Sequence, residues 1–281
     1  MIRLKNISYG YSRFTYLFKN MDFEIGEGNI VGLLGRNGAG KSTLLRLING
    51  LLQARQGTVE VLGFDPFERS PNFLEEVIMI PEEHNLPDKT VMQHYADSLA
   101  IFYPRFDKER LKSLLVDFDL NATKKLGKCS YGQRKKFLIA FALSSGCKLL
   151  LLDEPTNGLD IPSKSLFRKM VAGNLQANQT VVISTHQVKD VENLIDRVIL
   201  VDHGKVMIDQ DMIAISDRYV FGFSTQQEEH WVYSEKALGG YHYVKLKEHG
   251  ENASQVNLEL FFNAVSHDKI TFQATKNEIV L

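Results

Sequence analysis

Short, continuous apolar runs recur along the chain and alternate with segments of helical periodicity. Such runs are typical of strands that are buried on both faces of a sheet. The predicted strands of this kind are Ile30–Leu34, Val77–Ile80, Leu149–Leu152, Thr180–Ser184 and Arg197–Val201. The helical patterns cover Lys41–Leu51, Val91–Phe102, Lys108–Phe118, Gln133–Ser145, Ile161–Leu175 and Gln187–Ile195. This alternation predicts an α/β fold with a mostly parallel sheet and helices on both faces.

Three segments depart from this alternation. Met21–Ile25 alternates apolar and polar residues, which predicts a half-buried strand. The stretch from about Thr90 to Gly127 has two helical patterns and no good strand, which indicates a helical insertion. From about Asp211 onward the chain becomes rich in aromatic residues, and we expect a small extension there. Its predicted strands are Tyr219–Ser224, Trp231–Tyr233 and Tyr241–Leu246, and its predicted helix is Asn257–Val265.

Composition excludes several classes of protein. The 281 residues are 44% hydrophobic and 24% charged, which is typical of a globular protein of one large or two modest domains. The net charge of -1 argues against a general electrostatic grip on nucleic acid, and the extension from Asp211 is acidic. The first residues lack the apolar segment of a signal peptide. The two cysteines, Cys129 and Cys147, favour a reducing compartment, so we expect a cytoplasmic protein.

A glycine-rich loop follows the strand Ile30–Leu34. Its sequence, Gly35-Arg36-Asn37-Gly38-Ala39-Gly40-Lys41-Ser42-Thr43, matches the phosphate-binding pattern G-x-x-x-x-G-K-[ST] and opens a helix. Glycines allow successive backbone N–H groups to surround an anion, and the N-terminus of the helix adds a partial positive charge. Lys41 would contact the β- and γ-phosphates, and the Ser42 hydroxyl would ligate Mg²⁺. A chance glycine-rich turn is the alternative, and the flanking strand and helix favour a nucleoside triphosphate site.

Polar residues follow two further buried strands. Asp153 and Glu154 come at the end of Leu149–Leu152, and His186 follows Thr180–Ser184. Ligands bind at the carboxyl ends of strands in such sheets, so we expect these residues to face the phosphate loop. Asp153 is the candidate ligand of Mg²⁺, and Glu154 is the candidate base for the attacking water. His186 would contact the γ-phosphate or brace Glu154; otherwise it is a hydrogen-bonded histidine at a strand end.

These motifs, taken in order, resemble the ATPase subunit of an ATP-binding cassette (ABC) transporter. The resemblance rests on Gly35–Thr43, Cys129–Gln133, Asp153-Glu154, Gly158–Asp160 and Ser184–His186, and it covers about residues 1–209. It implies a P-loop NTPase (RecA-like) core with a helical subdomain, which agrees with the predicted insertion. It also implies a head-to-tail dimer with a second ATPase subunit, holding ATP and Mg²⁺ between the subunits.

The resemblance implies a signature segment at residues 129–133, where the family usually has Leu-Ser-Gly-Gly-Gln. Ser130, Gly132 and Gln133 match that pattern, and they would contact the γ-phosphate bound by the opposite subunit. Tyr131 replaces a glycine, which leaves open how closely the backbone approaches the nucleotide. Ser130 is equally suited to be an ordinary N-cap of the helix that follows.

Three further roles are implied by the resemblance alone. Glu82 stands where the family has a glutamine that ligates Mg²⁺, and its alternative is a solvated acidic loop. Tyr11 aligns with an aromatic residue that stacks on adenine, although Tyr9 and Tyr16 are close in the sequence. Asp160 would cross the dimer interface, and it is also suited to cap the helix starting at Ile161.

The resulting expectation is an ATPase domain over 1–210, with a helical subdomain at about 90–145, and a C-terminal α+β extension over 211–281. The family resemblance implies that the domain powers a separate integral membrane permease from the inner face of the cell membrane. By analogy the permease is of the exporter type. The alternatives are a soluble cassette ATPase acting on ribosomes or DNA, and a P-loop kinase. The aromatic residues of the insertion are predicted as core, or else as a docking groove for the permease: Tyr95, Phe102, Tyr103 and Phe106.

Overall fold

The central sheet places the predicted strand ends side by side. The computed structural model describes residues 1–176 and 178–270, so residues 271–281 of the predicted extension lie outside the described residues. Six strands are hydrogen-bonded in the order β5-β6-β7-β3-β8-β9. All neighbours are parallel except β8 and β9. The strands are β3 (Ile30–Leu34), β5 (Val77–Ile80), β6 (Leu149–Asp153), β7 (Thr180–Thr185), β8 (Arg197–Asp202) and β9 (Lys205–Asp211). The predicted mostly parallel sheet is therefore confirmed.

A second, antiparallel sheet covers one face of the helix that follows the glycine-rich loop. Its order is β2-β1-β4, and its strands are β1 (Ile2–Tyr9), β2 (Phe18–Ile25) and β4 (Gln56–Val61). The helix α1 (Lys41–Ile48) shares one apolar core with this sheet and with one face of the central sheet. Burying α1 on both sides fixes the start of the helix, and with it the glycine-rich loop.

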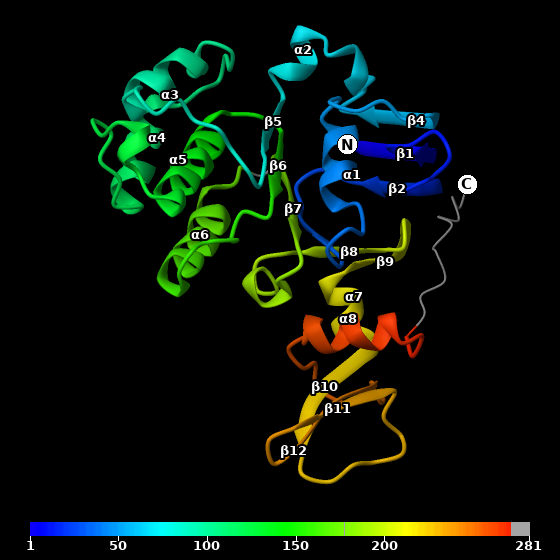
Figure 1. The fold of residues 1–281 in the computed structure, drawn as a ribbon. Coiled ribbons are helices and arrows are strands. Elements are labelled where there is room, and N and C mark those ends of the chain that lie inside the picture. Colours follow the sequence, from blue (N-terminus) through cyan, green and yellow to red (C-terminus); the bar gives the residue numbers. More distant parts are fainter. Residues whose placement is uncertain (177, 271–281) are drawn as a thin grey trace.

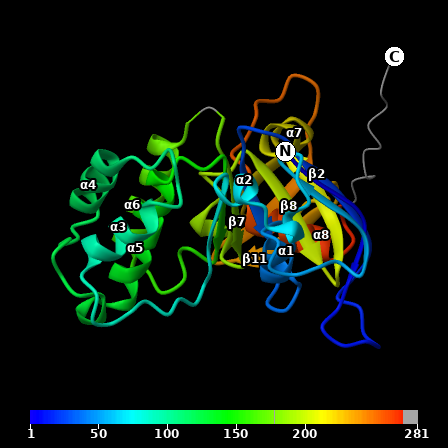
Figure 2. The ribbon, with the colours of Figure 1, turned by 90° about the horizontal axis from the view of Figure 1, so that it is seen from above.

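Helices α3, α4 and α5 form a lobe to one side of the sheets, with α6 beside them (Figures 1 and 2). Their bounds, with the short helices, are η1 (Pro66–Glu68), α2 (Pro71–Leu74), α3 (Met92–Ala100), α4 (Lys108–Asp117), η2 (Leu126–Lys128), α5 (Tyr131–Ser144) and α6 (Ile161–Asn174). In the lobe, Tyr95 packs on Phe137, and Tyr103 and Phe106 pack on Phe141. The aromatic residues of the insertion are thus mainly core, except Phe102, which is 63% exposed.

The C-terminal extension begins directly after β9 and folds into a helix-covered antiparallel sheet. The sheet order is β10-β12-β11, with β10 (Tyr219–Ser224), β11 (Tyr233–Ala237) and β12 (Gly240–Leu246). The helices are α7 (Met212–Arg218) and α8 (Leu258–Ser266), and α8 packs against the short helix η3 (Val188–Asp190). The buried side chains of the extension belong to the same apolar cluster as those of the lobe. The extension is therefore joined to the rest of the chain by packing as well as by sequence.

Three predicted elements are wrong in part. The helix predicted over Gln187–Ile195 is only the short η3 followed by turns, because Asp196 must pair with Ile30 so that β8 can start beside β3. The strand predicted over Trp231–Tyr233 is β11, shifted to Tyr233–Ala237, because it pairs with β12. The helix predicted to reach Leu51 ends at Ile48, since Gly50 turns with a φ of 70° against the backbone of Pro66.

Candidate functional site

The glycine-rich loop lies between β3 and α1, as predicted. Its tip at Arg36, Asn37 and Gly38 is exposed, whereas Gly35 and Ala39 are buried. Gly38 and Gly40 have φ values of 82° and 103°, which only glycine adopts readily. A Cβ at Gly40 would also lie 2.5 Å from the Phe18 ring. The loop conformation thus requires the glycines that the phosphate-binding pattern supplies.

A pair of oxygen-bearing side chains lies beside this loop. The Ser42 hydroxyl, at the start of α1, donates to Asp153 Oδ1 at 2.9 Å, and Asp153 ends β6. Ser184 on the neighbouring β7 also donates to Asp153 Oδ1, and Asp153 is only 2% exposed. The predicted pairing of Ser42 with Asp153 is therefore present in the structure. Ser184 was not predicted as a site residue, because a serine within an apolar strand gives no signal of its partner.

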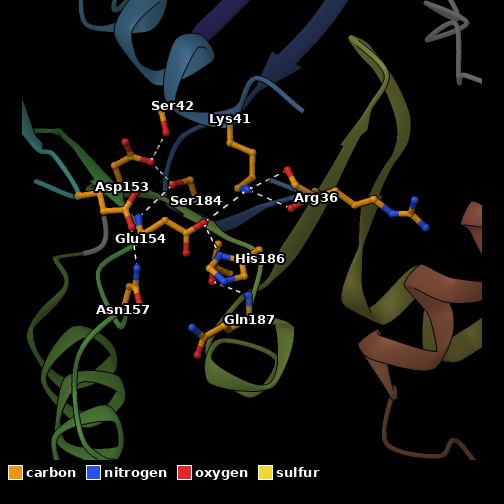
Figure 3. Close-up of polar contacts among 12 residues, drawn as sticks. Arg36, Lys41, Ser42, Asp153, Glu154, Asn157, Ser184, His186 and Gln187 are labelled. Atoms are coloured by element: carbon orange, nitrogen blue, oxygen red, sulfur yellow. Dashed lines mark hydrogen bonds and ion pairs between the residues drawn. The ribbon is translucent and has the colours of Figure 1, made fainter. Parts of the chain in front are cut away.

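Glu154 lies at the centre of the polar contacts in Figure 3. Its Oε1 is 2.9 Å from His186 Nδ1 and 3.4 Å from Lys41 Nζ. Its other oxygen, Oε2, is buried and makes no hydrogen bond among the described residues. Because a buried carboxylate oxygen without a partner is costly, this atom indicates a site shaped for a further polar group. The structure thus brings Glu154, His186 and Lys41 together.

The backbone of Glu154 is held in an uncommon conformation. Its φ is 44°, in the left-handed region, which is unfavourable for a residue with a side chain. Its N–H donates to the Ser184 backbone oxygen at 3.0 Å and to the Ser184 hydroxyl at 3.1 Å. Its carbonyl oxygen accepts from the Lys135 ammonium. Backbone strain of this kind is frequent at functional sites, where surrounding contacts maintain it.

Lys135 was not predicted as a site residue. It lies on α5 and is fully buried. Burial lowers its pKa to about 8, while the carboxylates of Glu82, Glu154 and Asp153 act in the opposite direction. Only its spacing could have given a signal, because one helical turn separates it from Tyr131 of the signature segment.

Ser130 caps α5 and forms a capping box with Gln133. The Ser130 hydroxyl accepts from the Gln133 N–H at 3.2 Å, and Gln133 Oε1 accepts from the Ser130 N–H at 3.1 Å. Gly132 has the Leu159 side chain as its nearest neighbour, at 3.5 Å from an added Cβ. Ser130 is therefore an N-cap, as its alternative reading predicted. Its predicted contact with a nucleotide of the opposite subunit stays a prediction.

Glu82 lies in the loop after β5, and its contacts differ from those of Ser42 and Asp153. Its Oε1 accepts from Asn157 Nδ2 at 2.6 Å, and its backbone oxygen accepts from the Tyr131 hydroxyl at 2.9 Å. In the part of the chain that the structure describes, no hydrogen bond joins Glu82 to Ser42 or Asp153. The structure thus links Glu82 to Asn157, and its role as a magnesium ligand stays a prediction.

Asp160 caps α6, as the alternative for this residue predicted. Its Oδ1 accepts from the Ser163 N–H at 2.9 Å, and these hydrogen bonds from Ser163 lower the pKa of the carboxyl group. Ile161, the next residue, is 84% exposed, so this end of α6 faces outward. A contact of Asp160 across a dimer interface stays a prediction.

Tyr11 is held beside the glycine-rich loop. Its hydroxyl is 2.9 Å from Thr43 Oγ1, and its ring packs edge-on against Tyr9 with 5.3 Å between centroids. The side chain is 65% exposed, whereas Tyr9 is buried. Tyr16 instead lies under the Arg55 guanidinium. Of the three tyrosines, Tyr11 therefore has both the exposure and the contact with the loop that adenine stacking requires.

Replacement of Tyr11 by alanine is expected to weaken ATP binding about 10-fold, since stacking on a base contributes about 1–3 kcal/mol. Titration with a fluorescent ATP analogue measures the effect. Tyr11→Phe keeps the ring and is expected to bind nearly as well as the wild type. Tyr16→Ala is the matched control and should leave affinity unchanged. An unaltered dissociation constant for Tyr11→Ala would contradict the assignment.

The residues of this site fit a triphosphate with Mg²⁺. The loop presents backbone N–H groups around glycines with positive φ, next to the Lys41 ammonium. Ser42 and Asp153 supply the oxygen donors that a hard cation prefers. The partnerless Glu154 Oε2 offers an acceptor for a water molecule. In the described residues, no group of three histidine, cysteine or acidic side chains forms another metal site.

Comparisons with known proteins agree with this geometry. The model of the family described as "ABC transporter" matches residues 18–157. The SkfA peptide export ATP-binding protein SkfE of Bacillus subtilis is 32% identical, with 81% of this chain and 93% of the relative covered. The chain belongs to the ABC transporter ATP-binding family. A methionine import ATP-binding protein, MetN of Clostridium acetobutylicum, is 37% identical over 73% of this cassette and 67% of the relative.

A solved structure supports the same fold for this cassette. The ATP-binding cassette MJ0796, in a dimeric post-hydrolysis state bound to ADP and Pi, is 26% identical with a TM-score of 0.64. The similarity covers 75% of this chain and 98% of that one. The ABC cassette is therefore an ATPase that uses ATP with Mg²⁺, and the alternative of a P-loop kinase is wrong. Among the described helices of the cassette, none has the length and apolar character needed to cross a membrane.

Proposed function

We propose that this ABC cassette dimerises on MgATP, hydrolyses it, and powers a separate integral membrane permease. The observation that carries the proposal is the environment of Glu154. One carboxylate oxygen is fixed by His186 at 2.9 Å and Lys41 at 3.4 Å, and the other is buried with no partner in the described chain. This arrangement suits a general base that is held in place at one oxygen and accepts a proton at the other.

In the proposed reaction, the glycine-rich loop and Lys41 bind the β- and γ-phosphates of ATP. Ser42 and Asp153 hold Mg²⁺, which would neutralise charge on the phosphates, with Glu82 as the third proposed ligand. Glu154 Oε2 accepts a proton from the water that attacks the γ-phosphorus. His186 orients Glu154 through Nδ1. Product release then removes the γ-phosphate contacts that hold two subunits together.

The second subunit would supply the signature residues Ser130, Gly132 and Gln133 in trans, and Asp160 would cross the interface. The helix α5 begins at Tyr131, so its N-terminus offers backbone N–H groups and a partial positive charge to a γ-phosphate. Support for a dimer comes from the dimeric state of the similar cassette MJ0796. The ring of Tyr131 lies against Gly158, within 2.8 Å of where a Cβ would stand.

Replacement of Ser130 by arginine is expected to lower ATP turnover about 100-fold, because a bulky side chain would block the approach of the opposite nucleotide. Loss of the cap alone costs about 1 kcal/mol of folding stability, which should lower the melting temperature only slightly. Phosphate release and thermal unfolding measure the two effects. Ser130→Asn is the matched control because it keeps a capping side chain. Unchanged turnover in Ser130→Arg would exclude the segment from the active site.

We propose that residues 1–210 form the ATPase domain, with the helical subdomain at about 90–145, and that 211–281 is a C-terminal extension. Two observations support this division. The central sheet ends with β9 at Asp211, and α7 begins at Met212. The extension contacts the rest of the cassette near His186, where α8 packs against η3 and Lys189 pairs with Glu259 at 2.7 Å.

The proposed location is the cytoplasmic face of the cell membrane, through the permease, and the proposed direction is export. SkfE supports export, whereas MetN is an import protein, so the direction requires a direct test. We expect the chain to copurify in detergent with a multispan membrane protein. Copurification with ribosomes or DNA would favour the soluble alternative. ATP-driven accumulation of the permease substrate in inside-out vesicles would support export, and its absence there with uptake in right-side-out vesicles would show import.

A further inference from the structure

The buried ammonium of Lys135 contacts the backbone that carries Glu154. Nζ donates to the carbonyl oxygens of Glu154 and Asn157, the latter at 3.1 Å, and to the Tyr131 hydroxyl at 3.4 Å. An ammonium group has three N–H donors, so these contacts use all of them. Burial of a charge is tolerated only where such contacts compensate for lost water. Lys135 therefore has a defined place in the turn that follows β6.

The same contacts continue into a closed ring of hydrogen bonds. The Tyr131 hydroxyl accepts from Lys135 and donates to the Glu82 backbone oxygen at 2.9 Å. The Glu82 carboxylate accepts from Asn157 Nδ2 at 2.6 Å, and the Asn157 carbonyl returns to Lys135 at 3.1 Å. The ring joins the start of α5, the loop after β5 and the turn after β6. Tyr131 and Glu82, the two departures from the usual family residues, thus belong to one network.

This ring acts on the part of Glu154 that His186 does not reach. His186 fixes one carboxylate oxygen, whereas Lys135 fixes the carbonyl of the same residue. The left-handed backbone of Glu154 needs support from both sides, and Ser184 supplies it at the N–H. A misplacement of about 1 Å in a catalytic group lowers turnover by as much as about 100-fold. The contacts on the carbonyl side are therefore expected to affect turnover.

We propose that Lys135 is a positioning residue for ATP hydrolysis, which ties the Glu154 turn to Tyr131 of the signature segment in the same subunit. This rests on the proposed role of Glu154 as the base. A contact of the signature segment with the opposite nucleotide would then be transmitted through Tyr131 and Lys135 to Glu154. The network offers a physical link between the two nucleotide sites of a dimer.

The test compares steady-state ATP hydrolysis by the full chain and by the variants Lys135→Met, Lys135→Gln and Lys136→Met. Lys135→Met keeps the length of the side chain without its donors, and kcat is expected to fall about 10- to 100-fold with KM for ATP within about twofold. Lys135→Gln keeps N–H donors and is expected to recover part of kcat. Lys136→Met is the control at the next residue and should match the wild type. A general structural defect would not separate kcat from KM in this way.

A double-mutant cycle tests the network itself. Tyr131→Phe removes one hydroxyl, and it is expected to lower kcat in the wild type but to have little further effect in Lys135→Met. If Lys135→Met does not fold, Lys135→Gln takes its place in the cycle. Wild-type kcat in both Lys135 variants, a rise in KM alone, or additive effects of Tyr131→Phe would overturn the proposal. Absence of ATP hydrolysis by the wild type would instead refute the proposed function.

Discussion

Replacement of Lys41 by methionine is expected to raise the dissociation constant for ATP at least about 100-fold. Lys41 is 6% exposed, and its ammonium lies against the Gly35 and Arg36 carbonyl oxygens and Glu154 Oε1. It is therefore held at the loop that would surround the phosphates. A hydrogen bond to a charged group contributes about 1.5–3 kcal/mol, so loss of contacts to two phosphates removes most of the affinity.

Isothermal titration calorimetry measures this loss directly. Lys164→Met is the matched control, because Lys164 pairs with Asp190 and Gln187 rather than with the loop. The control is expected to bind ATP like the wild type. Circular dichroism of Lys41→Met should show the wild-type fold. Binding of unchanged affinity by a folded Lys41→Met chain would mean that the glycine-rich loop is not the triphosphate site.

Replacement of Glu154 by glutamine is expected to lower kcat for ATP hydrolysis about 1,000-fold while ATP binding is kept. General-base catalysis contributes about 10²–10⁴-fold, and an amide cannot accept the proton from water. Glutamine has nearly the same shape as glutamate and retains an oxygen that can bond to His186. The contacts of the backbone with Ser184 and Lys135 do not depend on the side chain. Binding and turnover should therefore separate in this variant.

Phosphate release under single-turnover conditions measures the effect of Glu154→Gln without a contribution from product release. Glu83→Gln is the matched control, because Glu83 is an exposed acidic residue of the loop after β5. Its kcat is expected to equal that of the wild type. A Glu154→Gln chain with more than about a tenth of wild-type kcat would rule out Glu154 as the base.

The sequence predicted the central sheet well, because its strands are apolar on both faces. It did not predict β1, where the alternation of buried residues is interrupted at Asn6, with a φ of 51°, and the register with β2 shifts. Strand β4 was missed because it has one fully buried position, Val61, and exists through its pairing with β1. Strands of this type depend on their partners, which a local pattern does not contain.

The candidate site shows the same division between local and distant information. The order of strand ends predicted that Ser42 would meet Asp153 and that His186 would meet Glu154, since parallel strands end at one edge. The contacts of Lys135 and of Glu82 with Asn157 were not predicted. They join residues that are far apart in the chain, and a lysine in a helix is normally exposed.

The central claim is that two copies of this chain hold MgATP between them until Glu154 hydrolyses it. Multi-angle light scattering of Glu154→Gln, with and without MgATP, tests this claim most directly. With MgATP, the account predicts a species of twice the mass of one chain, which returns to a single chain when Lys41→Met is added to Glu154→Gln. A Glu154→Gln chain that binds MgATP at saturation and stays monomeric at high protein concentration would contradict the account.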